Sequence, residues 1–385
     1  MKILFIMPRY HTNQYYVMKT LIDNGYDVEV IVRYVGQSED YSIVNPKNLG
    51  YSKLFERLFG LIKKYLPNRK DPNKFERQFG FPPIISIIKL FKQSKSNIVI
   101  IRDIDSVYSV MSFLLSWIFK KGIIIYTQIP KYSEGRKLIL LQKIINQFFN
   151  VTWITPTRIE KNTESIVHKD TYYLPFVYEP SINILKKRYF INNRINILMI
   201  GKFQENKNHL LLLQAINKLK DKYPIMLTII GEKSNLKHER YYNKVIEYIN
   251  ENKLTTIVII KLNLTFKDVQ TEYEKQDLFI IPSQEPASVS LLEAMSFALP
   301  VISSNKNGTK CYIKNGSNGF VFEEGNLNNL VKSIEKVINS RETLVAMGKK
   351  SHELVLSEHS PEMYYNNFCK MVLEKGFNTR KNVGS

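Results

Sequence analysis

Two glutamates stand eight positions apart in the stretch SQEPASVSLLEAMSFALPVISS (residues 283–304). Glu285 precedes a proline, and Glu293 lies in a run of leucine, alanine and methionine that is typical of a buried helix. An ionised carboxylate is costly to bury unless a partner donates hydrogen bonds to it. Vicinal hydroxyl groups of a ligand would supply such bonds to Glu293, whereas the alternative is an ordinary glutamate on a solvated helix face. Ser288 and Ser290 are expected to cap this helix, whose start would then favour an anion.

A second group of residues with chemical potential lies in GKFQENKNH (residues 201–209). Gly201 follows an apolar run and is expected to let the backbone turn tightly, and Asn206 is expected to cap the helix that follows. The N–H groups at a helix start attract an anion, and the ammonium groups of Lys202 and Lys207 beside them would suit a diphosphate. The alternative is two solvated surface lysines. Neither a Walker loop nor a dinucleotide-binding glycine fingerprint occurs here.

Alternating apolar runs and segments of helical period position these residues. Such a pattern indicates parallel sheets covered by helices on both faces. Strands are expected at residues 2–7, 27–33, 97–102, 122–128 and 152–156, and then at 195–201, 225–231, 256–262, 278–283, 300–304 and 319–322. Helices are expected at 14–24, 83–94, 106–119, 207–220, 238–252, 266–276, 287–298 and 326–339. The sequence therefore predicts two doubly wound α/β domains, joined near residues 174–194, with a ligand cleft at the carboxyl ends of the strands.

The length and composition fit this organisation. A chain of 385 residues is too long for one ordinary core. A hydrophobic content of 44% with 12% aromatics is typical of a globular protein and excludes a disordered one. Two cysteines, Cys311 and Cys369, show no metal-binding spacing and are expected to be reduced thiols. The apolar run at 106–119 is shorter than the roughly twenty residues of a bilayer span, so it is interpreted as a core helix, and no signal peptide is expected.

The formal net charge is +20, and residues 51–100 alone contain 11 basic and 3 acidic residues. Such an excess attracts nucleic acid, anionic lipid or phosphorylated substrates, and charge alone does not choose among them. Residues 53–66 form an amphipathic pattern. Its apolar face comprises Leu54, Phe55, Leu58, Phe59, Leu61, Ile62, Tyr65 and Leu66, and its polar face comprises Lys53, Glu56, Arg57, Lys63 and Lys64. This helix either lies on an anionic membrane surface or packs on its own sheet; no nucleic-acid-binding motif appears.

Three strings carry a resemblance to a known family: GKFQENKNH, LFIIPSQEPASVSLLEAMSFALPVISS and NGSNGFVFEEGN. They resemble the C-terminal domain of family 4 retaining glycosyltransferases, which have the GT-B fold. The resemblance is strong over about residues 195–340 and weak before residue 190. It implies two Rossmann-like domains facing a central cleft: residues 1–185 bind the acceptor and residues 189–360 bind a nucleotide sugar. A C-terminal helix within 361–385 would cross back to the first domain.

The resemblance also implies roles for the residues singled out above. Lys202 and Lys207 would neutralise the donor diphosphate, Glu293 would hold the ribose hydroxyls, and Glu285 would help stabilise positive charge at the anomeric carbon. Because cations and N–H groups stabilise the departing diphosphate, no metal ion or other cofactor is expected. The complete implied donor site comprises Gly201, Lys202, Lys207, Gly231, Glu232, Lys261, Leu262, Ser288, Val289, Ser290 and Glu293, with Glu285 as the catalytic carboxylate.

This sequence departs from the family pattern in three places. EPAS stands where relatives often have E-G-F-G, so the pocket for the donor sugar is expected to be reshaped. The first loop, MPRYHTNQYY, lacks the usual glycines, and its Arg9 and His11 are candidates to approach donor or acceptor. His11 is alternatively an ordinary loop histidine facing water. Where many relatives have a histidine in the first domain, Gln128 stands in its place and would act in catalysis by positioning the reactants together with Lys131.

The function implied is that of a hexosyltransferase-type retaining glycosyltransferase. It would transfer a sugar from a nucleoside-diphosphate sugar to a saccharide acceptor, expected to be lipid-linked, during synthesis of a surface polysaccharide. The expected location is cytoplasmic, peripheral on the inner face of the cell membrane through residues 53–66. Three alternatives remain: a nucleotide-sugar epimerase of the same architecture, a phosphorylase with pyridoxal phosphate on a lysine, or a non-catalytic membrane-associated member.

Overall fold

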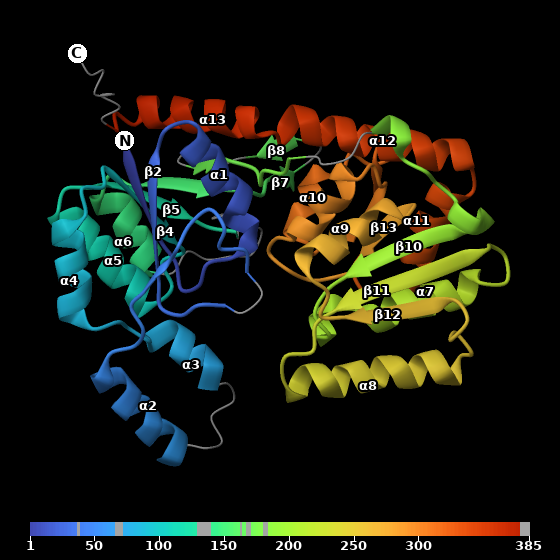
Figure 1. Cartoon of the computed structure of the whole chain (residues 1–385), viewed down its shortest axis with the longest axis horizontal. Coiled ribbons are helices and arrows are strands. Elements are labelled where there is room, and N and C mark those ends of the chain that lie inside the picture. The colour runs from blue at the N-terminus through green and yellow to red at the C-terminus, as the bar shows by residue number, and fades with distance from the viewer. Residues whose placement is uncertain are drawn as a thin grey trace. The chain divides into compact units, whose positions relative to one another are not determined.

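The computed structural model describes residues 1–36, 39–65, 72–128, 140–161, 164–166, 171–179 and 184–377. The chain divides into two compact units, each built on a parallel sheet flanked by helices (Figure 1). Unit 1 comprises Met1–Val177 together with Pro361–Ser385, and unit 2 comprises Tyr178–Ser360. The predicted α/β class with two doubly wound domains is therefore confirmed.

Unit 1 contains a seven-stranded parallel sheet in the order β3-β2-β1-β4-β5-β6-β9. Its strands are β1 (Lys2–Ile6), β2 (Asp27–Val32), β3 (Lys47–Asn48), β4 (Ile98–Arg102), β5 (Gly122–Tyr126), β6 (Thr152–Thr155) and β9 (Thr171–Tyr173). Its helices are α1 (Tyr15–Asp23), α2 (Lys53–Tyr65), α3 (Pro72–Phe79), α4 (Ile84–Gln93), α5 (Val107–Ile118), α6 (Leu140–Phe148) and α13 (Pro361–Glu374). A separate antiparallel hairpin pairs β7 (Ile159–Lys161) with β8 (Glu164–Ile166).

The pleat of the central strands explains their continuous apolar sequence. Successive residues of a strand face opposite sides of the sheet. In β1, Ile3 and Phe5 pack toward α1 and α13, whereas Leu4 and Ile6 pack toward α4 and α5 (Figure 1). Since both faces are covered, the buried positions from Ile3 to Ile6 must be apolar, whereas Lys2 at the start of the strand is partly exposed.

The last helix, α13, belongs to unit 1 although it follows unit 2 in the sequence. It packs beside α1 (Figure 1) and buries Tyr364, Phe368, Met371 and Val372 in the core on that side of the sheet. The predicted return of the C-terminal helix to the first domain is therefore confirmed.

Unit 2 contains a six-stranded parallel sheet in the order β12-β11-β10-β13-β14-β15. Its strands are β10 (Ile195–Ile200), β11 (Ile225–Gly231), β12 (Val258–Leu262), β13 (Leu278–Ile281), β14 (Val301–Ser304) and β15 (Gly319–Phe322). Its helices are α7 (His209–Leu219), α8 (Leu236–Glu251), α9 (Phe266–Glu274), α10 (Val289–Ser296), α11 (Leu327–Ile338) and α12 (Arg341–Glu358). The sequence interpretation did not anticipate α12.

The strand order locates a switch point in each sheet. The chain builds outward in one direction from β1 through β2 and in the other from β4 through β5, so the crevice lies between β1 and β4. In unit 2 the corresponding crevice lies between β10 and β13. Open α/β sheets bind ligands beyond the carboxyl ends of the strands at such points.

The apolar run expected to be a core helix forms α5, but its buried face is mixed. Tyr108 and Phe113 are buried together with Ser112 and Ser116, whereas the apolar Trp117 is exposed. The two serine hydroxyls donate to carbonyl groups four residues earlier, at 2.8 and 2.7 Å, so their burial leaves no donor unsatisfied. Among the described residues, no helix combines the length and the apolarity that crossing a bilayer requires.

Candidate functional site

The switch point of unit 2 brings together Lys207 and Glu285. Lys207 lies in the loop after β10, Glu285 lies in the loop after β13, and their ammonium and carboxylate groups form an ion pair. The two side chains are only 13% and 17% exposed. A cation and an anion thus face each other at the place where the fold is expected to bind a ligand.

A chain of hydrogen bonds fixes the carboxylate of Glu285. The hydroxyl of Ser283 donates to Glu285 Oε1 at 2.8 Å, and Asn307 Nδ2 donates to Ser283 Oγ at 3.0 Å. Both supporting residues are fully buried, and the backbone N–H of Gly308 donates to the carbonyl of Glu285 at 3.0 Å. Glu285 is therefore held in one orientation before any ligand binds, which is the condition for electrostatic stabilisation of a reacting group.

Gly201 makes room for the side chain of Lys207, and the turn does not depend on it. Its backbone is not in the left-handed region, so the expected tight turn does not require a glycine. A Cβ atom at this position would lie 3.3 Å from Cδ of Lys207 and 3.5 Å from its Cγ. The absence of a side chain therefore lets the aliphatic part of Lys207 pack directly against the backbone.

Lys202 is also paired with a carboxylate. Its Nζ lies 2.8 Å from Oε2 of Glu232, with side chains 38% and 33% exposed. Burial alone raises the pKa of Glu232, but the ion pair outweighs it, so the pKa lies below its ordinary value. The sequence interpretation placed two ammonium groups here, and the structure pairs each of them with a glutamate.

Glu293 lies on α10 and accepts a hydrogen bond from Tyr273. The Tyr273 hydroxyl lies 2.9 Å from Glu293 Oε2 and 3.1 Å from the carbonyl oxygen of Ser290. The tyrosine is itself buried, with its ring stacked 5.2 Å from that of Phe297. Burial raises the pKa of Glu293 to about 7, although the Tyr273 hydrogen bond acts in the opposite direction. Glu293 is therefore half-buried among apolar neighbours, and the pKa of its carboxyl lies well above the ordinary value.

A raised pKa makes stability depend on pH in a defined direction. The Glu293 carboxyl holds its proton up to about pH 7 in the folded protein, but it ionises near pH 4.5 when unfolded. The folded state thus binds more protons between these values, so the free energy of unfolding should fall as the pH rises through them. The loss should be complete above pH 7, and it amounts to about 3 kcal/mol. Chemical denaturation of the wild type and of Glu293→Gln at about pH 5 and about pH 8 measures it. Equal pH dependence in both proteins would contradict the raised pKa.

The residues expected near the nucleotide base make structural contacts. A Cβ atom on Gly231 would lie 2.2 Å from the ring of Phe203, so the glycine allows that ring to approach. Lys261 pairs with Glu272 at 2.7 Å, and Leu262 packs against the apolar core of unit 2.

Two of the expected helix caps are wrong. Asn208, not Asn206, precedes α7, because residues 205–207 form a short 3₁₀ turn first. Ser288 does precede α10, but its hydroxyl lies 2.8 Å from that of Ser290 instead of capping a backbone N–H. Helix α10 begins at Val289, and the Ser288 hydroxyl caps none of its first backbone N–H groups.

Unit 1 has a cavity of about 560 Å³ at its own switch point. The loops after β1, β2 and β4 and the end of α3 all contribute to its lining. Its charged lining residues are Arg9, Arg33, Arg77, Arg102, Asp103 and Asp105, with His11 beside them. This volume falls in the range of ligand pockets.

The predicted first-domain residues lie in or beside this cavity where the structure describes them. Arg9 Nη2 donates to His11 Nδ1 and lies equally close, 3.1 Å, to Glu39 Oε1, so His11 is not simply a histidine facing water. Gln128 Oε1 accepts a bond of 3.1 Å from Arg102 Nη2, so Gln128 orients an arginine of the cavity. Lys131 lies outside the described residues.

The sequence interpretation missed most of the arginines of the cavity. Arg102 ends β4 and Arg33 directly follows β2, so a charged residue at the end of a buried strand was an available signal. Asp103 and Asp105, in an Asp-x-Asp spacing after β4, were overlooked in the same way. In the part of the chain that the structure describes, no three His, Cys, Asp or Glu side chains gather into a metal-binding group.

Comparison with known proteins finds that unit 2 is similar to glycosyltransferases. Residues 181–354 match the family model "Glycosyl transferases group 1". The chain is 31% identical over 161 residues to an uncharacterized glycosyltransferase of Haemophilus influenzae, covering 40% of this chain and 42% of the relative. It is 27% identical over 199 residues to the capsular polysaccharide biosynthesis glycosyltransferase CapM of Staphylococcus aureus, covering 49% and 50%. A third relative is the UDP-Gal:alpha-D-GlcNAc-diphosphoundecaprenol alpha-1,3-galactosyltransferase of Escherichia coli, with 26% identity over 162 residues, covering 33% and 42%.

The matches span about half, or less, of the length of these curated relatives. Solved structures cover almost the whole chain. A glycosyltransferase of Rickettsia africae superposes with a TM-score of 0.73 at 17% identity, covering 98% of this chain and 99% of the other. HepE of Anabaena, in complex with UDP-glucose, superposes with a TM-score of 0.71 at 12% identity, covering 97% and 100%. At these identities the likeness concerns the fold, which is the GT-B fold expected from the sequence.

Proposed function

We propose that this chain is a retaining glycosyltransferase that uses a nucleoside-diphosphate sugar as donor. The observation that carries the proposal is the Lys207–Glu285 ion pair at the switch point of unit 2, with Glu285 fixed by buried hydrogen bonds. The pair lies within the residues that match the group 1 glycosyltransferase model. The Anabaena protein of the same fold is described in complex with UDP-glucose, which supports a nucleotide sugar as the ligand.

In this proposal the donor diphosphate binds between Lys202, Lys207 and the first N–H groups of α10. The ribose hydroxyls lie against Glu293. When the bond between the anomeric carbon and the diphosphate oxygen breaks, negative charge builds up on the diphosphate and positive charge on the sugar. The ammonium and N–H groups stabilise the first, and the Glu285 carboxylate stabilises the second. No metal ion is required for this step.

The acceptor hydroxyl attacks the anomeric carbon from the face that the diphosphate leaves, so the configuration is retained. Its proton passes to the departing diphosphate oxygen, and the products are a glycoside and a nucleoside diphosphate. The two ion pairs fit this reaction, because a ligand diphosphate can share Lys207 with Glu285 and Lys202 with Glu232. No cation is then left unpaired.

A screen of nucleotide sugars for thermal stabilisation tests the donor class. A ligand present at 100 times its Kd adds about 2.7 kcal/mol to the free energy of unfolding, which is expected to raise the melting temperature by roughly 5 °C. One uridine or guanosine diphosphate sugar should produce this shift, and the same sugar without its nucleotide should not. A screen in which no nucleotide sugar stabilises the protein would contradict the proposal.

We further propose a lipid-linked saccharide acceptor and attachment of unit 1 to an anionic membrane through α2. The helix divides into two apolar stripes. Phe55 and Phe59 face inward and pack against each other at 5.5 Å. Four other apolar residues form a stripe that is 48–68% exposed: Leu54, Leu58, Leu61 and Tyr65. The sequence left open whether this helix packs on its own domain or lies on a membrane. The buried stripe fits the first alternative, and the exposed stripe is free for the second.

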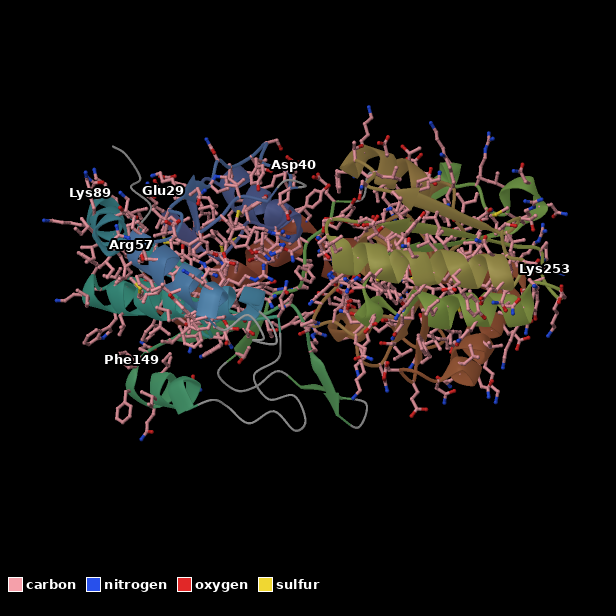
Figure 2. The ribbon with its side chains drawn as sticks, turned by 90° about the horizontal axis from the view of Figure 1, so that it is seen from below. Glu29, Asp40, Arg57, Lys89, Phe149 and Lys253 are labelled. Atoms are coloured by element: carbon pink, nitrogen blue, oxygen red, sulfur yellow. The ribbon has the colours of Figure 1, made fainter. Side chains whose placement is uncertain are left out.

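Charge complementarity supports a lipid surface for the exposed stripe. At 100° per residue, Lys53, Arg57 and Lys64 fall on one flank of it, and Arg57 is visible on α2 in Figure 2. An apolar stripe bordered by basic side chains is typical of a helix that lies in the headgroup region. The relative from Escherichia coli is named for an acceptor on diphosphoundecaprenol, which supports a lipid-linked acceptor for this chain.

Substitution of two exposed leucines tests the attachment. The Leu58→Glu/Leu61→Glu variant is expected to bind vesicles of phosphatidylcholine and phosphatidylglycerol at least about tenfold more weakly, because it removes apolar area and adds repulsion. Co-sedimentation measures the binding, and Leu356→Glu, another exposed leucine on α12, is the matched control. Equal binding by the wild type and the double variant would contradict the role of α2.

A further inference from the structure

We propose that the cavity of unit 1 binds a phosphate or diphosphate group, and that this group belongs to the acceptor. The assignment of this group to the acceptor rests on the proposed function, whereas the anion site itself does not. Four arginines line one cavity of about 560 Å³: Arg9, Arg33, Arg77 and Arg102. They come from four separate segments that converge at the switch point of the sheet.

Unsatisfied donors carry the first step. Nε of Arg9, Nε of Arg33 and Nη1 of Arg102 are buried and have no hydrogen-bond partner among the residues that the structure describes. Buried donors without acceptors are costly and rare in native proteins, so three of them around one cavity require an explanation. Arg33 is only 1% exposed, so it does not contact a ligand directly. The side chains of Arg9 and Arg102 are 24% and 16% exposed, so an oxyanion in the cavity would bind their accessible N–H groups and offset the positive charge of the cluster.

The second step is that the arginines are already oriented. Arg102 is held by Gln128 at 3.1 Å, and Arg9 is held by Glu39 at 3.1 Å. Each guanidinium group thus uses part of its fork on the protein and keeps other N–H groups for a ligand. A guanidinium group restrained in this way loses little conformational freedom when it binds an anion.

Arg33 acts as a positioning residue for Arg77. Its Nη1 donates to the carbonyl of Gly80 at 2.7 Å, and its Nη2 donates to the carbonyl of Arg77 at 3.2 Å. Its guanidinium group also lies 5.6 and 5.5 Å from the ring centres of Tyr51 and Tyr108. These contacts fix the C-terminal end of α3 and thereby the place where Arg77 joins the cavity lining.

The number and spread of the donors favour a phosphate over a carboxylate. A carboxylate offers two oxygens in one plane, which one arginine fork satisfies. A phosphate or diphosphate offers three or more oxygens in several directions and can accept from guanidinium groups that surround it. Asp103 and Asp105 also line the cavity and would suit hydroxyl groups of a sugar joined to the phosphate. Asp103 has a left-handed backbone, with φ of 56°, a conformation that clusters at functional sites.

Calorimetric titration of the full chain with inorganic pyrophosphate tests the site at about 0.15 M salt. Because the proposed donor cradle could also bind pyrophosphate, the titration is repeated with two double variants. Binding should persist in Lys202→Ala/Lys207→Ala. It should weaken at least about tenfold in Arg77→Ala/Arg102→Ala, since each arginine substitution removes charge-assisted hydrogen bonds to the anion. Binding that is lost only with the lysine substitutions, or no pyrophosphate binding at all, would overturn the proposal.

Two further variants guard against trivial explanations. Arg77→Ala alone changes an exposed side chain, so it should fold normally and still weaken binding. Lys89→Ala removes one positive charge from α4 (Figure 2). Lys89 does not line the cavity, so the affinity should be unchanged. An equal loss in Lys89→Ala would mean that net charge alone attracts the anion, which overturns a built site.

The source of the phosphate is identified by two more probes. Farnesyl diphosphate represents a lipid-borne group, and glucose 6-phosphate represents a soluble sugar phosphate. Whichever binds more tightly than pyrophosphate in the wild type, and loses that affinity in Arg77→Ala/Arg102→Ala, identifies the class of acceptor. Failure of the proposed function remains distinguishable: a chain that binds no nucleotide sugar yet binds these probes through the arginines retains the anion site.

Discussion

The Glu285→Gln variant is expected to transfer sugar about 100 to 1,000 times more slowly than the wild type, because one preorganised electrostatic group contributes about this much to a reaction. Glutamine has nearly the same shape and keeps an oxygen that can accept the hydrogen bond from Ser283. It lacks the negative charge that would stabilise the positive charge at the anomeric carbon. The rate should therefore fall while the binding of donor changes little. Release of nucleoside diphosphate, measured with acceptor present, follows the reaction.

A matched control is Glu335→Gln. Glu335 also forms an ion pair with a lysine, Lys222 at 2.8 Å, but this pair lies away from the switch point. Its substitution should leave the rate unchanged. Unaltered transfer by Glu285→Gln would remove Glu285 from the mechanism. Conversion of the donor sugar to an epimer in the absence of acceptor would instead indicate a nucleotide-sugar epimerase.

The Lys207→Ala variant is expected to bind nucleoside diphosphate about 10 to 100 times more weakly, the loss of one or two charge-assisted hydrogen bonds. Lys202→Ala should have a smaller effect. Lys207 is 13% exposed and Lys202 is 38% exposed, so water and salt screen the second charge more strongly. Calorimetric titration with uridine diphosphate and guanosine diphosphate measures both variants. Lys222→Ala, which removes a surface lysine of the same unit, serves as control.

Lys207→Ala also leaves the Glu285 carboxylate partly buried without its cation. The free energy of unfolding should fall by about 1–3 kcal/mol, and Lys207→Ala/Glu285→Ala should recover part of that loss. This recovery separates the cost of an unpaired charge from the loss of ligand binding. If Lys207→Ala binds both diphosphates as tightly as the wild type, the diphosphate site lies elsewhere.

The buried strands could be predicted from the sequence because a sheet covered on both faces requires apolar residues throughout. The run expected at 225–231 forms β11 over Ile225–Gly231, and most other strands end within two residues of expectation. Helix α12 could not be predicted in the same way. Its buried face includes Gly348, Ser351 and His352, so burial does not produce an apolar period there. Tertiary packing, and not local pattern, determines which side of this helix is covered.

The candidate site could be predicted in part. Lys207 and Glu285 each stood out, because each follows an apolar strand, but their pairing joins residues 78 positions apart. Nothing local indicates that two such groups will meet. The supporting roles of Asn307 and Tyr273 also depend on contacts between separate segments, whereas Ser283 lies only two residues from Glu285. In unit 1 the loop residues Arg9 and His11 were expected to matter, whereas Arg77 became visible only once α3 was placed beside the cavity.

The return of α13 to unit 1 has a consequence for how the protein is made. Ribosomes release the amino-terminal residues first, and domains generally fold as they emerge. Here the earliest segment to appear cannot finish its hydrophobic interior until the residues from Pro361 onward are synthesised, because Tyr364, Phe368, Met371 and Val372 complete it. A nascent chain halted at Ser360 would expose the apolar surface of α1 that α13 covers in the complete protein. The lobe that is translated first is thus the one that matures last.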